Sequence, residues 1–377
     1  MKARILSALC VVTAVAAAGG AAFLTGCASG HKQFAYVVGQ GTNEVFEFRA
    51  LRSGALSPLA TPNFAVGSNP SALAVHTSGD FLYVADFSGN DVTLLDINQS
   101  TGDLSVPVSS SIVVPVNPPN VFSTGTGPSA VAMSPTAPFL FVANQTSGNI
   151  SAFTVDPGAG GLGGVQGSPF PISPVSNPTS LAVTPQGNLL YVANPTQGTV
   201  AGFVIGSNGQ LSQAGAPTPV GTSATPTSLV IDHSGRFLYV ADSTNNAVAG
   251  FAIQSNGSLT PIAGSPFAAG LQPLAVAADP QGTVLFAANS GSNNVSAYVI
   301  DSATGALGPV KGAPFATGGL GPSGLAVDAH STVLYVTDQG THDVAAMVIN
   351  TDGSLQAVTG SPFAVATAAT VVTPVLR

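Results

Sequence analysis

One acidic or amide residue recurs at the end of six similar apolar runs in the chain. The six positions are Asp86, Asn144, Asn194, Asp242, Asn289 and Asp338. Carboxylate and amide oxygens are ligands of Ca²⁺, so a ring of such side chains could bind a cation or another ligand. The same residue types also cap turns by accepting hydrogen bonds from nearby backbone N–H groups. Because carboxylate alternates freely with amide, capping is the favoured interpretation, and Asp86, Asp242 and Asp338 are kept as candidate binding residues.

The histidines do not indicate a metal site. His76, His233 and His330 occupy three adjacent positions of equivalent turns, which would place them around one rim rather than at one point. The sequence contains no His-rich metal motif and no Gly-x-Ser-x-Gly nucleophile elbow. We therefore predict neither a metal ion nor a cofactor.

The only glutamates, Glu44 and Glu47, could supply the acid and the base of a hydrolytic reaction. Arg49 follows Glu47 by two positions, and side chains two residues apart lie on the same face of a strand. A solvated ion pair between Glu47 and Arg49 on an outer strand is the simpler interpretation. The sequence therefore identifies no catalytic residue.

These residues all lie within a repeat. Its phrase is Leu-Tyr-Val-Ala-Asp or a close variant, and its aromatic residue recurs at positions 36, 83, 141, 191, 239, 286 and 335. The spacings are 47, 58, 50, 48, 47 and 49 residues. Seven strand-like copies at this period are typical of a β-propeller.

Each repeat is expected to form a blade of four antiparallel strands. A Pro-led apolar run such as 70–75 comes first, the aromatic phrase second, a run such as 150–153 third, and a strand opened by a Gly-Leu turn fourth. The N-terminal copy lacks its first strand, whereas an extra apolar run, 369–376, follows the last copy. We therefore predict an all-β, seven-bladed β-propeller, closed by pairing of this C-terminal run with the strand around Tyr36.

One connection is longer than the others. Leu104 and Pro128 are 24 residues apart, whereas the equivalent residues of four other repeats are 14 or 15 apart. Loops on rigid scaffolds often carry function, so Asn117, Asn120 and Phe122 are further candidate binding residues on a surface loop near one mouth of the ring. A tolerated insertion is an equally open alternative.

The N-terminal residues have the layout of a secretory signal: the basic residues Lys2 and Arg4, an apolar stretch over 5–18, then small residues. Leu24-Thr25-Gly26-Cys27 resembles the lipobox of bacterial lipoproteins, which implies cleavage before Cys27 and a lipid on its thiol. We expect a signal peptide over 1–26, lipidated Cys27 and a tether over 27–33, and the propeller over 34–377. The exported protein would be held at the membrane by its lipid, facing the periplasm or the cell surface.

The charge balance excludes one class of partner. Only 6% of residues are charged, and without residues 1–26 the chain has six basic and sixteen acidic residues, a net charge of −10. Such a body offers no basic surface for nucleic acid. We expect a monomer.

The repeat resembles the YVTN-repeat propellers and the lactonase family of seven-bladed propellers, which includes 6-phosphogluconolactonase-like proteins. The resemblance covers nearly all of residues 34–377, and its motifs belong to the framework of the blades. The resemblance implies the propeller fold and suggests lactone hydrolysis.

Two functions are compatible with these observations. The favoured one is a module that binds an unidentified protein or small-molecule ligand; the alternative is a lactone hydrolase, either 6-phosphogluconolactonase-like or acting on a neutral lactone. A phosphorylated substrate needs basic groups. After residue 26 these are limited to Lys32, Arg49, Arg52, Arg236, Lys311 and Arg377.

Overall fold

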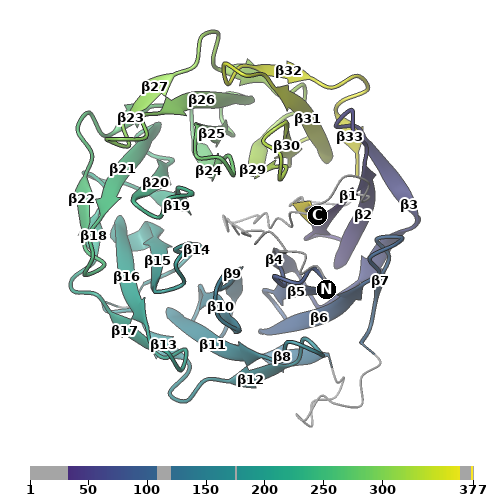
Figure 1. Ribbon diagram of the computed structural model, residues 1–377, viewed down its shortest axis with the longest axis vertical. Coiled ribbons are helices and arrows are strands. Elements are labelled where there is room, and N and C mark those ends of the chain that lie inside the picture. Colours follow the sequence, from purple (N-terminus) through teal and green to yellow (C-terminus); the bar gives the residue numbers. More distant parts are fainter. Residues whose placement is uncertain (1–32, 108–119, 175, 366–374, 377) are drawn as a thin grey trace, which may run out of the picture.

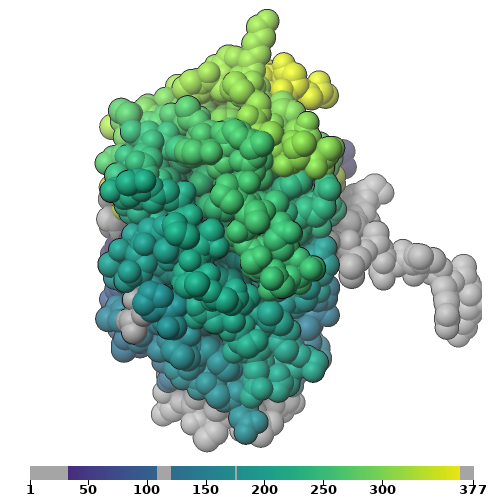
Figure 2. Space-filling view, turned by 90° about the vertical axis from the view of Figure 1, so that its left-hand side faces the viewer, coloured from purple at the N-terminus to yellow at the C-terminus, as the bar shows by residue number. Residues whose placement is uncertain are grey.

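Each repeat forms one antiparallel β-sheet, and seven such sheets follow one another around a ring (Figure 1). The computed structural model describes residues 33–107, 120–174, 176–365 and 375–376. We number the sheets as blades 1 to 7 in chain order. In Figure 2 the ring is seen edge-on, with the teal and green middle of the chain facing the viewer. The predicted all-β, seven-bladed propeller is confirmed.

The first strand of each blade lies innermost. In blades 2 to 7 these strands are β4 (Pro70–Val75), β9 (Pro128–Met133), β14 (Ser180–Val183), β19 (Pro226–Ile231), β24 (Pro273–Ala278) and β29 (Pro322–Val327). In blade 1 the innermost strand is β34 (Val375–Leu376), which comes from the other end of the chain.

The second strand of each blade carries the aromatic phrase. From blade 1 to blade 7 these strands are β1 (Gln33–Gly39), β5 (Phe81–Asp86), β10 (Phe139–Asn144), β15 (Leu189–Asn194), β20 (Phe237–Asp242), β25 (Val284–Asn289) and β30 (Val333–Asp338). The third strands, in the same order, are β2 (Glu44–Ala50), β6 (Asp91–Ile97), β11 (Asn149–Val155), β16 (Thr199–Ile205), β21 (Ala247–Ile253), β26 (Asn294–Ile300) and β31 (Asp343–Ile349). One 3₁₀ turn, η1 (Pro195–Gln197), joins β15 to β16.

The outermost strand is continuous only in blade 1, where it is β3 (Leu56–Ala65). In blades 2 to 7 it is split into two short pieces that pair with opposite ends of the third strand. The pairs of pieces are β7 (Leu104–Ser105) and β8 (Val121–Ser123), β12 (Leu162–Gly164) and β13 (Phe170–Pro171), β17 (Leu211–Gln213) and β18 (Thr218–Pro219), β22 (Leu259–Pro261) and β23 (Phe267–Ala268), β27 (Leu307–Pro309) and β28 (Phe315–Ala316), and β32 (Leu355–Ala357) and β33 (Phe363–Ala364). The predicted fourth strand is therefore present but interrupted.

The second strands form the core because each is packed between the two neighbouring blades. They are buried on both sides, which explains their almost continuous apolar sequence. Five of their tyrosines donate a hydrogen bond to a glycine carbonyl of the next blade. These bonds, 2.6–3.0 Å long, join Tyr36 to Gly102, Tyr83 to Gly160, Tyr191 to Gly257, Tyr239 to Gly305 and Tyr335 to Gly54.

The two ends of the chain share blade 1. β34 pairs antiparallel with β1, with Leu376 opposite Ala35 and Val375 opposite Tyr36. The predicted closure is confirmed for these residues, while 366–374 lie outside the described part of the chain. Pairing of the two ends leaves no open sheet edge inside the ring.

The ring has two distinct faces because all inner strands run in the same direction. We call one the connection face; it carries the segments that enter the inner strands, such as 66–69, and the turns between second and third strands, such as 87–90. We call the other the turn face; it carries the turns between first and second strands, such as 76–80.

The described ends of the long connection of blade 2 are β7 and β8, the two pieces of its outermost strand. The expected place of the extra residues near one mouth of the ring stays a prediction. Asn117, within 108–119, lies outside the described residues, as do Cys27 and the proposed signal and lipid anchor. No helix in the described ranges is long and apolar enough to cross a membrane.

Candidate functional site

The recurring acidic and amide residues lie at the connection face but are buried. Asp86 and Asp338 are completely inaccessible, and Asp242 is 3% exposed. Asp242 accepts hydrogen bonds from the backbone of Thr225, at 2.9 Å, and from the side chain of Asn245, at 2.6 Å. These side chains therefore hold the segment entering the blade and the adjacent turn in place, and a ligand at the surface would not touch Asp86 or Asp338.

Burial changes the acidity of two of these carboxyl groups. Burial raises the pKa of Asp86 to about 8. The hydrogen bond from Thr93 opposes this increase, and the nearby charge of Asp91 adds to it. Burial raises the pKa of Asp338 to about 7, where Thr317 opposes the shift and Asp343 adds to it. Both shifts favour retention of a proton at a pH where an exposed aspartate is ionised.

Asn120 and Phe122 belong to blade 2 itself. Phe122 is 3% exposed and packs in the apolar core of the blade, with Val92 opposite it in β6. The side-chain amide of Asn120 donates a hydrogen bond to the Leu94 carbonyl at 3.2 Å, and the backbone carbonyl of Asn120 accepts one from the backbone N–H of Leu94. Asn120 and Phe122, the two described candidate residues of this connection, therefore take part in the hydrogen bonding and packing of blade 2.

The expected solvated ion pair between Glu47 and Arg49 is wrong. Glu47 is 1% exposed, and its carboxylate accepts a hydrogen bond from the Leu104 backbone of the next blade at 2.9 Å. Burial raises the Glu47 pKa to about 7, opposed by the Leu104 bond and assisted by Asp103. The neighbouring blade covers this strand position, so alternation within one strand could not predict its environment.

A shallow hollow of about 540 Å³ opens on the connection face between blades 5 and 6. It is lined by uncharged residues: Ser243, Thr244, Asn246, Leu271, Gln272 and Gly291. Hydroxyl and amide groups can bind a polar molecule, but no acid or base lines this hollow to activate water.

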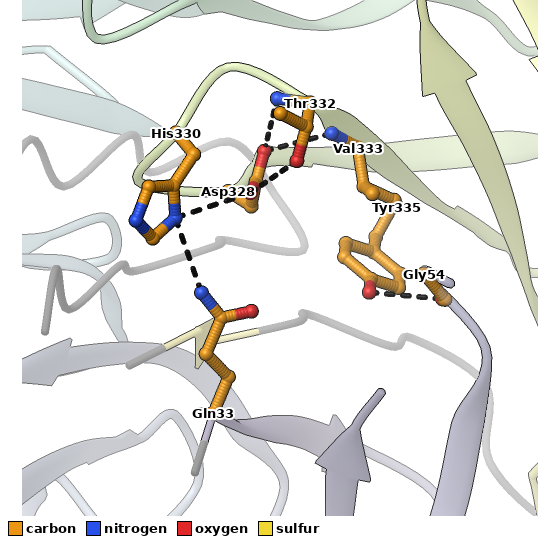
Figure 3. Close-up of polar contacts among 7 residues, drawn as sticks. All are labelled: Gln33, Gly54, Asp328, His330, Thr332, Val333 and Tyr335. Atoms are coloured by element: carbon orange, nitrogen blue, oxygen red, sulfur yellow. Dashed lines mark hydrogen bonds and ion pairs between the residues drawn. The ribbon is translucent and has the colours of Figure 1, made fainter. Parts of the chain in front are cut away.

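The histidines of the turn face have different environments. His76 is 5% exposed, with its Nδ1 atom 2.8 Å from the Ser78 hydroxyl, and burial lowers its pKa. His233 is exposed. His330 is exposed over 60% of its side chain, and its Nδ1 atom lies 3.7 Å from Oδ2 of Asp328 (Figure 3). Of the three, His330 alone combines an accessible ring with a carboxylate partner.

The turn of blade 7 holds this pair in position. Asp328 is 4% exposed, and its Oδ1 atom accepts hydrogen bonds from the backbone of Thr332 and Val333, at 2.5 and 2.7 Å. Its Oδ2 atom accepts the Thr332 hydroxyl at 2.7 Å and faces His330. Gln33 is the first described residue of blade 1, and its side-chain amide nitrogen lies 3.3 Å from Nδ1 of His330, the ring atom that also faces Asp328 (Figure 3).

A histidine beside a fixed carboxylate can act as a general base. A nearby carboxylate stabilises the imidazolium that forms when the histidine ring takes a proton. We call Asp328, His330 and Gln33 the turn-face cluster. Gln33 and His330 lie 297 positions apart, so the sequence indicated His330 but not the cluster; the spacing Asp-x-His within one turn was the available signal. In the described ranges no group of three or more His, Cys, Asp or Glu residues could hold a metal ion.

The ring of seven blades and its shared closing sheet define the chain as a seven-bladed β-propeller with a polar cluster exposed on one face. The family model described as lactonase, seven-bladed β-propeller, matches residues 27–225 and 216–320. The chain belongs to this family.

Similar proteins carry related names. The chain is 26% identical over 134 residues to the 6-phosphogluconolactonase of Bacillus subtilis, a match that spans 35% of this chain and 36% of that protein. The structure of a periplasmic gluconolactonase from Pseudomonas aeruginosa matches with a TM-score of 0.71 and 21% identity, covering 88% of this chain and 98% of that one. A 6-phosphogluconolactonase-like protein from Bacteroides fragilis matches with a TM-score of 0.73 and 19% identity, covering 93% and 99%.

These comparisons correct the favoured function. The interpretation as a non-catalytic binding module is overturned by membership of the lactonase family, together with the names of these relatives. The findings support the alternative, a lactone hydrolase.

Proposed function

We propose that this protein hydrolyses a lactone and that His330 is the general base of the reaction. Membership of the lactonase family is the observation that carries the proposal. The turn-face cluster supplies the chemistry that the reaction needs, because a lactone is an ester and its hydrolysis requires activation of a water molecule.

The reaction can be written with the residues of this cluster. The neutral imidazole of His330 removes a proton from water while the water oxygen attacks the lactone carbonyl carbon, and the carbonyl electron pair moves onto its oxygen. Collapse of this tetrahedral intermediate restores the C=O bond and breaks the ring C–O bond. The departing ring oxygen takes the proton from the imidazolium, giving a hydroxy acid. The Asp328 carboxylate stabilises the imidazolium throughout.

The charges of the turn face favour an uncharged lactone over a phosphorylated one. Its six described turns between first and second strands contain four aspartates, Asp80, Asp232, Asp279 and Asp328, but only one arginine, Arg236. The Arg236 guanidinium donates to the Ser302 carbonyl and lies over the Phe237 ring, 5.0 Å from its centre. A dianionic phosphate near His330 would meet a negative field without an adjacent cation to offset it.

The test is an assay of the purified protein on an uncharged aldonolactone and on the 6-phosphate of the same lactone. Acid release in a pH-stat, corrected for spontaneous opening of the ring, measures the enzymatic rate. We expect kcat/KM for the uncharged lactone to exceed that for the phosphorylated one by at least about tenfold, which corresponds to about 1.4 kcal/mol. A rate equal to the spontaneous one with both substrates would reject lactone hydrolysis. Preference for the phosphate would reject the substrate class only.

A further inference from the structure

Two blades contain a pair of facing aspartates where two others contain a pair of asparagines. In blades 3 and 6 the last residue of the second strand is opposite the first residue of the third strand: Asn144 opposite Asn149, and Asn289 opposite Asn294. The Nδ2 atom of one amide donates to Oδ1 of the other, at 2.7 Å in blade 3 and 2.8 Å in blade 6. These positions therefore bring two side chains into direct hydrogen-bond contact.

The same register positions hold Asp86 and Asp91 in blade 2, and Asp338 and Asp343 in blade 7. A carboxylate can only accept hydrogen bonds, so two ionised carboxylates cannot reproduce the bond between the asparagines. One oxygen of each aspartate is buried without a hydrogen-bond donor: Oδ1 of Asp86 and Asp91, Oδ2 of Asp338 and Oδ1 of Asp343. One proton within each pair would supply the missing donor.

A backbone segment covers one aspartate of each pair. A Cβ atom placed on Gly67 would lie 2.4 Å from Cγ of Asp86, and one on Gly319 would lie 2.5 Å from Oδ2 of Asp338. Both glycines belong to the segments that enter inner strands β4 and β29. Such close backbone approach excludes water from Asp86 and Asp338, whereas their partners Asp91 and Asp343 are half-buried.

The ionisable neighbours of each pair are few. Asp91 is the charged group that acts on Asp86, whose second oxygen accepts the Thr93 hydroxyl at 2.6 Å. Asp343 acts on Asp338, whose second oxygen accepts the Thr317 hydroxyl at 3.0 Å, and His342 acts on Asp343. Burial raises the pKa of all four carboxyl groups, which favours retention of a proton in each pair.

The two pairs flank the place where the ring closes. Blades 2 and 7 are the neighbours of blade 1, in which β1 pairs with β34. In blades 3, 4 and 6 the corresponding residue is an asparagine, whereas in blade 5 Asp242 faces Ala247 and has no carboxylate partner. The acidic pairs are therefore confined to the two blades beside the closure.

We propose that one proton is shared within each aspartate pair, Asp86 with Asp91 and Asp338 with Asp343. Loss of these protons at alkaline pH loosens the connections at Gly67 and Gly319 and thereby weakens ring closure. The direction of the change in stability with pH follows from proton binding. The folded state holds these protons at a pH where the unfolded chain has released them, so unfolding free energy falls as pH rises from the usual aspartate range to about pH 8.

The test compares the melting temperature at about pH 5 and about pH 9 in the wild type and in a D86N/D338N double variant. Each new amide can donate to the remaining aspartate, as Asn144 donates to Asn149. We expect the double variant to lose at least half of the wild-type decrease in melting temperature over this range. The matched control is Asp242→Asn, at the equivalent position without a facing carboxylate, which should retain the full decrease.

Hydrogen exchange gives a local measurement. Amides of the segments around Gly67 and Gly319 should lose protection at about pH 9 in the wild type but not in the double variant. The segment around Gly125, which lies over the Asn144 pair, should keep its protection in both proteins. Parallel melting curves and unchanged exchange in the two proteins would overturn the proposal.

Titration of the aspartate carboxyl groups in the wild type tests the proposal even if the double variant does not fold. In the full-length wild type labelled with ¹³C at the aspartate carboxyl carbon, two aspartate signals should titrate above about pH 6. Completion of all aspartate titrations below about pH 5 would show that no proton is shared and would reject the proposal.

Discussion

The hydroxyl group of Tyr335 donates a hydrogen bond to the backbone carbonyl oxygen of Gly54 at 2.9 Å, across 281 positions of the sequence (Figure 3). Tyr335 belongs to blade 7 and Gly54 to blade 1, so this bond crosses the closing interface of the ring. Tyr239 makes the same bond to Gly305 at 2.8 Å, between blades 5 and 6. The closing interface thus uses the same contact as an interface between consecutive repeats.

Tyr335→Phe should destabilise the protein by about 1–3 kcal/mol, because the buried Gly54 carbonyl loses its donor while ring packing is retained. Phenylalanine already occupies the equivalent positions 141 and 286, so the aromatic ring alone fits this environment. Urea unfolding measures the change. Tyr239→Phe is the matched control and should have a similar cost. A cost for Tyr239→Phe with none for Tyr335→Phe would mean that the closing interface contributes little to stability.

Glu47→Gln should reduce the dependence of stability on pH. Burial raises the Glu47 pKa from 4.5 to about 7, so the folded state retains a proton that the unfolded chain releases, and unfolding free energy falls as pH rises through this range. The glutamine keeps an oxygen for the Leu104 N–H but cannot ionise. The variant should show a smaller decrease in stability over this range. Glu44→Gln, at the more exposed end of the same strand, is the control and should leave the pH slope unchanged.

Phe122→Ala should cost about 3–5 kcal/mol, as is usual for removal of a buried phenylalanine side chain. Phe122 follows the extra residues of blade 2 and packs in the core of that blade. Val106→Ala, on the other side of the insertion, is the control: Val106 is 44% exposed, and its truncation should cost less than about 0.5 kcal/mol. Equal and small costs for both variants would indicate that β8 is not an integral part of the blade.

The fold could be predicted because the same apolar strand sequence recurs at a regular spacing. The phrase that becomes β5, β20 and β30 is buried on both sides in every blade, so the same apolar residues recur at the same positions. The division of the outer strand was not predicted because its two pieces pair with one strand at different places. In blade 5, for example, β22 pairs with the end of β21 and β23 with its beginning.

The site was harder to predict because its contacts join distant parts of the chain. The backbone of Leu104, 57 positions after Glu47, covers that carboxylate, and no pattern within β2 indicates this. Gln33 reaches His330 across 297 positions only because the ring closes between blades 7 and 1. The repeat also concealed a difference: Asp86 and Asn144 occupy equivalent positions, but only Asp86 faces a second carboxyl group.

Replacement of His330 by asparagine is the most direct test of the proposed chemistry, with turnover of an uncharged lactone as the measurement. The side chain of His330 is 60% exposed, so the variant should fold normally. We predict a decrease in kcat of about 100-fold or more, the usual contribution of a general base. His233→Asn, an exposed histidine on the same face without a carboxylate partner, should keep full activity. Undiminished turnover by the His330→Asn variant would contradict the assignment of the base to the turn-face cluster.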